Sequence, residues 1–273
     1  MPAVSIFDRI VVGVDGTEWG FEALRQALAL APDRATVRAV TALDTAPAVH
    51  TGFQAPHFAD LLTQEAEEAR ATAETIIDSR PEADARVVRG KPADVLRRER
   101  DALGATLLAL GGRRSSRFLG VVLGDTGTQL LHDAACSLLL ACPSAEGSWR
   151  PRRIVVGLDA SSYARDALAT ADELARSVGG SVEVVSATAG EPAQPDAGWA
   201  ERVQIWDVAD PVRALVARSR DADLLVVGAR GVRGIRAIGS VSERIAHQAH
   251  CTALVVHETV PGAMTVRTAY SGP

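Results

Sequence analysis

The chain contains the same sequence pattern twice. Residues 9–17 (RIVVGVDGT) return as residues 153–161 (RIVVGLDAS), with six of nine positions identical. A second block, 107–136, is similar to 224–251. The spacing between equivalent residues falls from 144 in the first block to 117 at the start of the second, so the second copy has lost twenty-seven residues between them. The chain is therefore a tandem repeat with unequal halves.

A length of 273 residues agrees with two domains, each large enough to bury a core of its own. We expect a first domain over 1–142 and a linker over 143–151 (PSAEGSWRP). A shortened second domain is expected over 152–260, and residues 261–273 are expected to form a loose tail.

Composition restricts the class of protein. The formal net charge is -5, which disfavours nonspecific binding to nucleic acid. The three cysteines form no even set for a disulfide framework, and the first ten residues lack the pattern of a signal peptide. No apolar run approaches the roughly 18 to 20 residues that span a bilayer. We therefore expect a cytoplasmic protein without a membrane segment.

Short apolar runs alternate with helical patterns along both halves. Residues 10–14 are too short for a helix and rich in β-branched side chains, as is typical of a parallel strand covered on both faces. The alternation predicts an α/β fold with two tandem open parallel five-stranded sheets and helices on both faces. A long amphipathic helix is expected at about 58–78. Residues 190–198 (GEPAQPDAG) leave no room for its equivalent, so the second half should lack this helix.

Two glycine-containing loops, 111–124 and 228–239, each follow a predicted strand and precede a predicted helix. In an open parallel sheet this is where anions bind, because glycine lets backbone N–H groups approach a ligand and the helix N-terminus favours negative charge. The spacing matches neither the P-loop nor the compact GxGxxG pattern. Simple turn glycines therefore remain an alternative to a ligand site.

Taken together, these pieces resemble the universal stress protein family in its tandem form. The family signature is a strand that ends in Asp followed by Gly-Ser or Gly-Thr, and later a loop of the form GxxG, nine residues, then Gly-Ser or Gly-Thr before a helix. The resemblance covers 10–142 and 154–257 and implies a fold similar to that of the adenine nucleotide alpha hydrolases. Members that bind ATP hold it at the carboxyl ends of the first and fourth strands, and other members bind none.

The first half departs from this pattern at two positions. Asp15, Gly111 and Gly124 match, but Arg114 stands where the second glycine is expected and Asp125 where a hydroxyl is expected. At about 4 Å and an effective dielectric near 20, a carboxylate facing phosphate costs on the order of 4 kcal/mol for each pair of unit charges, unless Mg²⁺ intervenes. We therefore expect weak ATP binding, or none, in the first half.

The second half retains more of the pattern, although its loop is two residues short. The resemblance implies an ATP site, with Mg²⁺, built from residues after the first and fourth strands of this half. They are Asp159, Ser161, Gly228, Gly231, Gly239 and Ser240. This asymmetry predicts that the second half senses a ligand while the first is a structural scaffold.

The sequence is compatible with three kinds of function. The resemblance favours a stress-response regulator that acts through an unknown protein partner without substantial catalysis. The alternatives are a nucleotide-free interaction module and an ATP-dependent adenylating enzyme, but the latter carries SGGxDS where this chain has VGVDGT or VGLDAS. His247, His250 and Cys251 are not repeated as a set in the first half, so we predict no metal site.

The last strand of each half is expected to form an internal contact. Family members commonly pair through this edge strand, and both copies, 137–141 and 253–257, are apolar strands that should not be left open. We therefore predict that they pair with each other and make an internal pseudo-dimer. A further homodimer is compatible with this arrangement.

Overall fold

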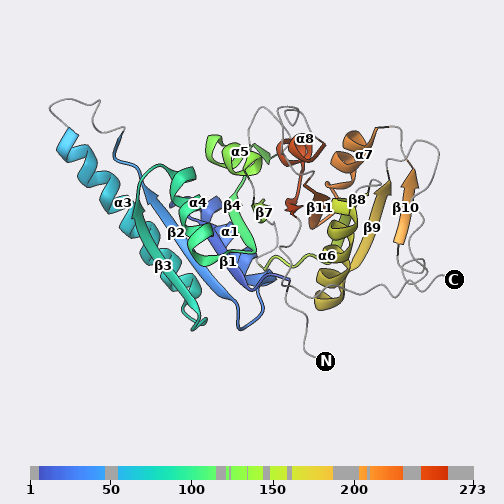
Figure 1. Ribbon diagram of the computed structural model, residues 1–273, viewed down its shortest axis with the longest axis horizontal. Helices are drawn as coiled ribbons and strands as arrows, with labels where there is room; N and C mark the ends of the chain where they lie inside the picture. Colours follow the sequence, from blue (N-terminus) through green and yellow to red (C-terminus); the bar gives the residue numbers. More distant parts are fainter. Residues whose placement is uncertain are drawn as a thin grey trace.

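The computed structural model describes residues 6–46, 55–114, 121–122, 124–133, 135–143, 148–158, 162–186, 203–207, 210–229 and 241–257. In both halves, helices alternate with strands (Figure 1). The first half contains β1 (Arg9–Gly13), α1 (Glu18–Leu30), β2 (Thr36–Leu43), α3 (Ala55–Ile77), β3 (Ala83–Arg89), α4 (Pro92–Leu103), β4 (Leu107–Gly111), β5 (Arg113–Arg114), β6 (Val121–Val122), α5 (Asp125–His132) and β7 (Ser137–Ala141). The second half contains β8 (Arg153–Leu158), α6 (Ser162–Val178), β9 (Ser181–Ser186), β10 (Val203–Asp207), α7 (Pro211–Arg218), β11 (Leu224–Gly228), α8 (Val241–Gln248) and β12 (Thr252–Val256).

The two predicted five-stranded sheets are joined into one. The ten strands follow the order β10-β9-β8-β11-β12-β7-β4-β1-β2-β3. Neighbours within each half are parallel, and β12 pairs with β7 antiparallel, with Leu254 opposite Leu139. The predicted α/β fold and the predicted pairing of the two last strands are both confirmed. Because the strand direction reverses at this join, the carboxyl ends of the two sets of strands lie at opposite edges of the sheet.

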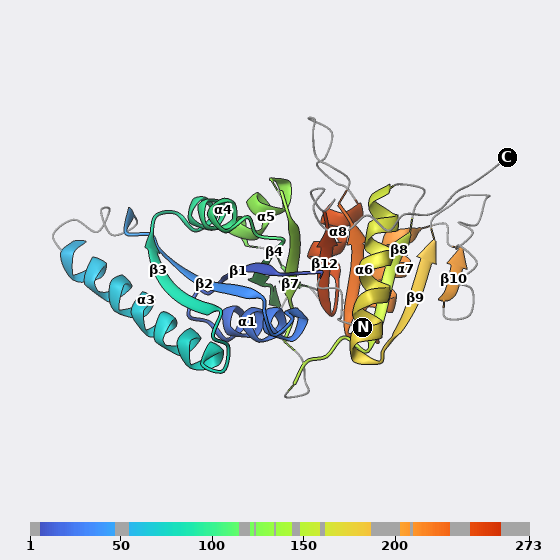
Figure 2. The same ribbon diagram turned by 60° about the horizontal axis from the view of Figure 1, so that its bottom comes forward.

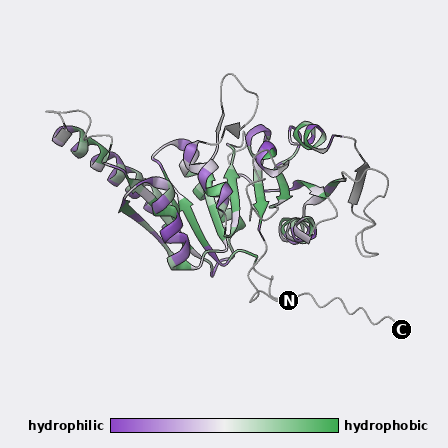
Figure 3. Ribbon diagram, turned by 45° about the horizontal axis from the view of Figure 1, so that its top comes forward, coloured by the Kyte–Doolittle hydropathy of each residue, from purple (hydrophilic) through white to green (hydrophobic). Residues whose placement is uncertain are grey.

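Helices cover both faces of the sheet (Figures 2 and 3). One face packs against α1, α3 and α6, and the other against α4, α5, α7 and α8. Adjacent residues of β1 show why its sequence is continuously apolar: Ile10 and Val12 belong to the first core cluster, and Val11 belongs to the second. The equivalent helices α1 and α6 share a face, so the halves are related by a pseudo-twofold axis perpendicular to the sheet.

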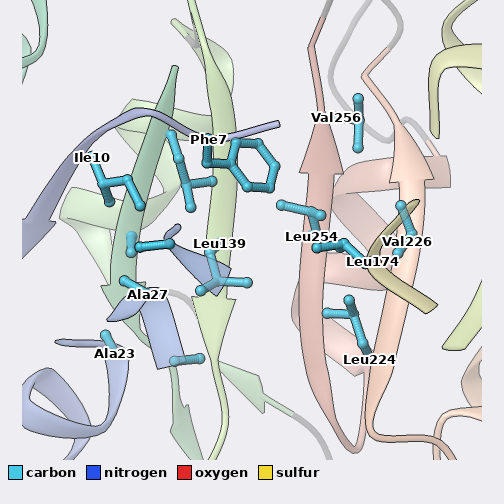
Figure 4. Close-up of a cluster of buried hydrophobic side chains, with 14 of the residues drawn as sticks. Phe7, Ile10, Ala23, Ala27, Leu139, Leu174, Leu224, Val226, Leu254 and Val256 are labelled. Atoms are coloured by element: carbon cyan, nitrogen blue, oxygen red, sulfur yellow. The ribbon is translucent and has the colours of Figure 1, made fainter. Parts of the chain in front are cut away.

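The core is continuous across the join. Leu139 of β7 and Leu254 of β12 are fully buried members of one cluster that also contains Phe7 and residues of both halves (Figure 4). Each fully buried leucine removes enough apolar surface from water to contribute about 1.5–3 kcal/mol. The two halves therefore share a core, which explains why neither strand is left as an open edge.

Hydroxyl groups reinforce the join in a reciprocal pattern. Thr252, at the start of β12, accepts a hydrogen bond from the Cys142 backbone N–H just beyond the end of β7, at 3.0 Å. Ser137, at the start of β7, accepts one from the His257 backbone N–H just beyond the end of β12, at 3.3 Å. Both hydroxyls are buried. The pair repeats under the pseudo-twofold axis and fixes the register of the two strands.

A glutamine of α1 adds an asymmetric contact to this join. Gln26 is fully buried, donates to the Cys142 carbonyl at 2.8 Å and accepts from the Thr252 hydroxyl at 2.7 Å. Its amide nitrogen also donates to Glu22 at 2.8 Å. Burying an amide without such partners would cost a few kcal/mol, so this network links α1 specifically to the other half.

The long helix belongs to the first half alone among the described residues. α3 packs on β2 and β3 and spans 23 residues. The equivalent crossover of the second half, residues 187–202, is too short for a helix of that length and lies outside the described residues. This agrees with the predicted loss of one helix. In the described part of the chain, no helix is both long enough and apolar enough to cross a bilayer.

Candidate functional site

Four of the nine predicted site residues can be placed. Asp15, Gly111 and Gly124 lie in the first half, and Gly228 ends β11 in the second. The other five lie outside the described residues: Asp159, Ser161, Gly231, Gly239 and Ser240. The predicted ATP site therefore remains a prediction in both halves. The described residues next to it are Asp15, Gly111, Gly124 and Gly228.

The Asp15 carboxylate is engaged with the start of α1. Its Oδ1 accepts from the Thr17 backbone N–H at 3.1 Å and from the Thr17 hydroxyl at 2.6 Å. The Thr17 hydroxyl in turn accepts from the Gly20 N–H at 3.3 Å and caps the helix. Gly16 allows this turn because its φ is +77°, in the left-handed region. The Asp-Gly-Thr sequence thus has a local structural role at the carboxyl end of β1.

Gly111 and Gly228 have a packing role that the sequence analysis missed. A Cβ on Gly111 would lie 2.5 Å from the backbone carbonyl carbon and oxygen of Trp19 in α1. A Cβ on Gly228 would lie 2.5 Å from the same two atoms of Tyr163 in α6. Such separations are far below van der Waals contact, so both positions require glycine whether or not a ligand binds. The repetition of glycine at both strand ends was the signal for this close approach.

The structure brings Asp15 and Gly111 together around Gly20. A Cβ on Gly20 would meet the Asp15 Oδ1 at 2.7 Å, and the Cβ position of Gly111 lies 2.9 Å from the Gly20 nitrogen. The carboxyl ends of the neighbouring strands β1 and β4 therefore meet at the first turn of α1, as the topology of a parallel sheet requires.

Gly124 has a different environment from Gly111. It is the exposed N-cap of α5, with φ -69°, and a Cβ there would meet no atom within 4 Å. Neither packing nor backbone conformation requires glycine at this position. Asp125 follows in the first turn of α5, where a carboxylate stabilises the helix N-terminus. Asp125 therefore has a structural role that does not involve a ligand.

The first-half glycine loop contains a hairpin that was not predicted. β5 and β6 pair antiparallel, with Arg114 opposite Val121 and Arg113 opposite Val122. Arg114 replaces the glycine of the family pattern, and its backbone belongs to this hairpin. β6 also contacts α8 of the second half. The loop expected to surround phosphate in the first half therefore contributes to the contact between the halves.

In the second half, the glycine position is tied to the following helix. The Ser242 hydroxyl, in the first turn of α8, donates to the Gly228 carbonyl at 2.8 Å, and Ser242 is buried. The equivalent residue of the first half is Gly127, which has no hydroxyl. Ser242 was also missed by the sequence analysis, although it lies only two residues beyond the predicted Ser240. It fixes α8 relative to the carboxyl end of β11.

The two equivalent cysteines are buried thiols. Burial raises the pKa of Cys136 to about 12, and the nearby Arg100 guanidinium opposes part of this rise. Burial also raises the pKa of Cys251, with Cys142 and Asp223 adding to the effect. A thiol that stays protonated is a poor nucleophile, so the geometry favours packing over redox chemistry.

A comparison with known families agrees with the repeated pattern. The profile of the universal stress protein family matches residues 6–141 and 191–257, which is most of the chain. The chain belongs to this family. The matched segments include β4 to β7 of the first half and β10 to β12 of the second, and therefore both glycine loops.

Individual relatives support the same assignment. Universal stress protein Rv2623 of Mycobacterium tuberculosis is 31% identical over 189 residues, which cover 57% of this chain and 63% of the relative. A crystal structure of a universal stress protein from Archaeoglobus fulgidus DSM 4304 matches with a TM-score of 0.72 at 17% identity, covering 92% of this chain and 99% of that one. A protein of Pseudomonas aeruginosa PAO1 matches with a TM-score of 0.65 at 16% identity, covering 94% and 95%. These two likenesses establish the fold.

Proposed function

We propose that this universal stress protein is a stress-response regulator that binds ATP with Mg²⁺ in its second half and acts through a protein partner rather than by turnover. The observation that carries the proposal is the difference between the two glycine loops. The first has Arg114 and Asp125 in place of the expected glycine and hydroxyl, and its strand β6 contacts α8 of the other half. The second is bordered by the Gly228 carbonyl and the Ser242 hydroxyl, which lie 2.8 Å apart. The second loop also keeps the glycines and serine of the family pattern.

Isothermal titration tests the proposal. Mg-ATP is titrated into protein that has been unfolded, stripped of nucleotide and refolded, and the released material is analysed by chromatography. We expect binding near one site per chain. Asp159→Ala or Gly231→Val should abolish it, whereas Asp15→Ala should leave the affinity within about twofold, because the Asp15 carboxylate is bonded to Thr17. Loss of binding in Asp15→Ala with retention in Asp159→Ala would reverse the assignment.

A second candidate function is a nucleotide-free interaction module. It is favoured by one observation: backbone contacts alone require glycine at both Gly111 and Gly228. If the refolded wild-type protein neither binds Mg-ATP nor releases nucleotide on unfolding, this second function is the better account. Release of pyrophosphate from ATP during incubation would instead support an adenylating enzyme.

A further inference from the structure

Helix α8 contacts elements of both halves. It lies beside α5 in two views of the molecule (Figures 1 and 2). The His132 Nε2 atom, in the last turn of α5, lies 3.6 Å from the Glu243 Oε1 atom in the first turn of α8. The two side chains are 35% and 17% exposed. Glu243 complements its helix, because a carboxylate is favourable at a helix N-terminus.

Two further contacts hold the same helix. β6 of the first-half hairpin packs against α8, and Ser242 bonds the Gly228 carbonyl of β11. The first turn of α8 is therefore connected to its own sheet through Ser242 and to the first half through Glu243. Because α8 follows directly on the second-half glycine loop, its position sets where that loop must end.

We infer that the first half is a brace that positions α8 for ligand binding in the second half through His132 and the β5–β6 hairpin, and that Ser242 is a positioning residue within the second half. The inference rests on the proposed function for its ligand, but the contacts themselves do not. In this arrangement the first-half glycine loop supports the site of the other half instead of surrounding a phosphate. A helix N-terminus is a useful anion partner only when it is held in place, so removing the brace weakens binding without removing a ligand-contacting group.

Hydrogen exchange of the α8 amides in nucleotide-free protein tests the brace directly. His132→Ala, Ser242→Ala and Val122→Pro, which interrupts the β5–β6 pairing, should each accelerate exchange in the first turns of α8 by up to about fivefold. Two matched controls should leave it unchanged. Ser219→Ala removes another buried hydroxyl, which bonds the Val216 carbonyl and the His250 N–H beyond the C-terminal end of α8. Arg70→Ala removes ion pairs with Glu67 and Glu74 within α3. Unchanged α8 exchange in His132→Ala and Val122→Pro overturns the brace, whatever the protein binds.

Titration with Mg-ATP then tests the positioning role. Ser242→Ala should weaken the affinity by about fivefold, and Ser242→Thr should restore it because the hydroxyl returns. Ser219→Ala should lower stability by a similar amount but leave the affinity unchanged. Faster α8 exchange with unchanged affinity would overturn the positioning role. Absence of Mg-ATP binding in the wild-type protein would overturn the proposed function. The hydrogen-exchange result would then decide only whether the first half holds α8 in place.

Discussion

The two glycine loops began from one pattern and now differ in what borders them. Gly111 and Gly228 occupy the same steric environment, each against the backbone of the first helix of its half, α1 or α6. Beyond that point the halves differ where both are described: Ser242 anchors α8 to the Gly228 carbonyl, whereas its equivalent in the first half is Gly127, which has no hydroxyl. β6 of the first loop, which pairs with β5, also contacts α8 of the other half. Positions fixed by backbone packing have thus stayed the same in both copies, whereas positions beyond them have changed.

The crossovers to the edge strands differ as well. In the first half α3 reaches β2 and β3, and in the second only 187–202 connects β9 to β10. Both halves nevertheless keep the same strand order outward from the join. The shared strand order therefore does not depend on a crossover as long as the one that contains α3.

Substitution of the packing glycines should have the largest effect on this comparison. Gly111→Ala and Gly228→Ala should each lower the free energy of unfolding by about 3 kcal/mol or more, because the new Cβ would meet helix backbone at 2.5 Å. Urea denaturation measures the change. Gly124→Ala is the matched control and should change stability by less than about 1 kcal/mol, since nothing lies within 4 Å of its Cβ position. Unchanged stability in Gly228→Ala would show that this glycine is not a packing residue.

The equivalent thiols make stability depend on alkaline pH. The folded-state pKa of Cys136 is raised from 9.0 to about 12, so its contribution is fully present below pH 9 and is lost as the pH rises toward 12. In that window each such thiol should lower the free energy of unfolding by about 1.4 kcal/mol per pH unit. Denaturation of wild type and Cys136→Ala between pH 8 and 11 measures the difference. Parallel pH dependence in the two proteins would contradict the prediction.

The reciprocal hydroxyls at the join should not be equal in effect. Thr252→Val should cost about 2 kcal/mol, because it removes a partner from both the Cys142 N–H and the buried Gln26 amide. Ser137→Ala removes the partner of the His257 N–H alone and should cost about 1 kcal/mol. A double-mutant cycle of Gln26→Leu with Thr252→Val should show coupling of about 1 kcal/mol. Equal losses of unfolding free energy in Thr252→Val and Ser137→Ala would show that the Gln26 contact adds nothing to the stability of the join.

The outer end of α3 should give the smallest effect. Leu61 is 42% exposed, and Leu61→Gln should change the free energy of unfolding by no more than about 0.5 kcal/mol. Ile77→Ala, at the buried end of the same helix, should cost about 2 kcal/mol or more. Thermal denaturation of both variants compares the two ends. A large loss in Leu61→Gln would mean that the outer turns of α3 contribute to the core.

Hydrophobic pattern and repetition were enough to predict much of the architecture. The short apolar runs could only be strands covered on both faces, and their alternation with helices implied parallel order within each half. The family resemblance, together with the apolar character of 137–141 and 253–257, predicted their pairing, which the pairing of Leu139 with Leu254 confirms. These predictions succeed because burial of apolar surface is encoded in residue type and local spacing.

The roles of particular polar and glycine residues could not be predicted in the same way. Gly111 suggested a ligand loop, but its close neighbour is Trp19, which lies 92 positions earlier in the chain. Gln26 and Thr252 are separated by 226 positions and meet only after both halves have folded. Residue type and spacing thus determined the repeat and the alternation of strands with helices, because these depend on local pattern, and the internal pairing followed from the family resemblance. Steric close approach, the buried hydrogen bonds of the join and the contacts on α8 were decided by the tertiary structure, because they depend on distances between segments that the sequence does not place.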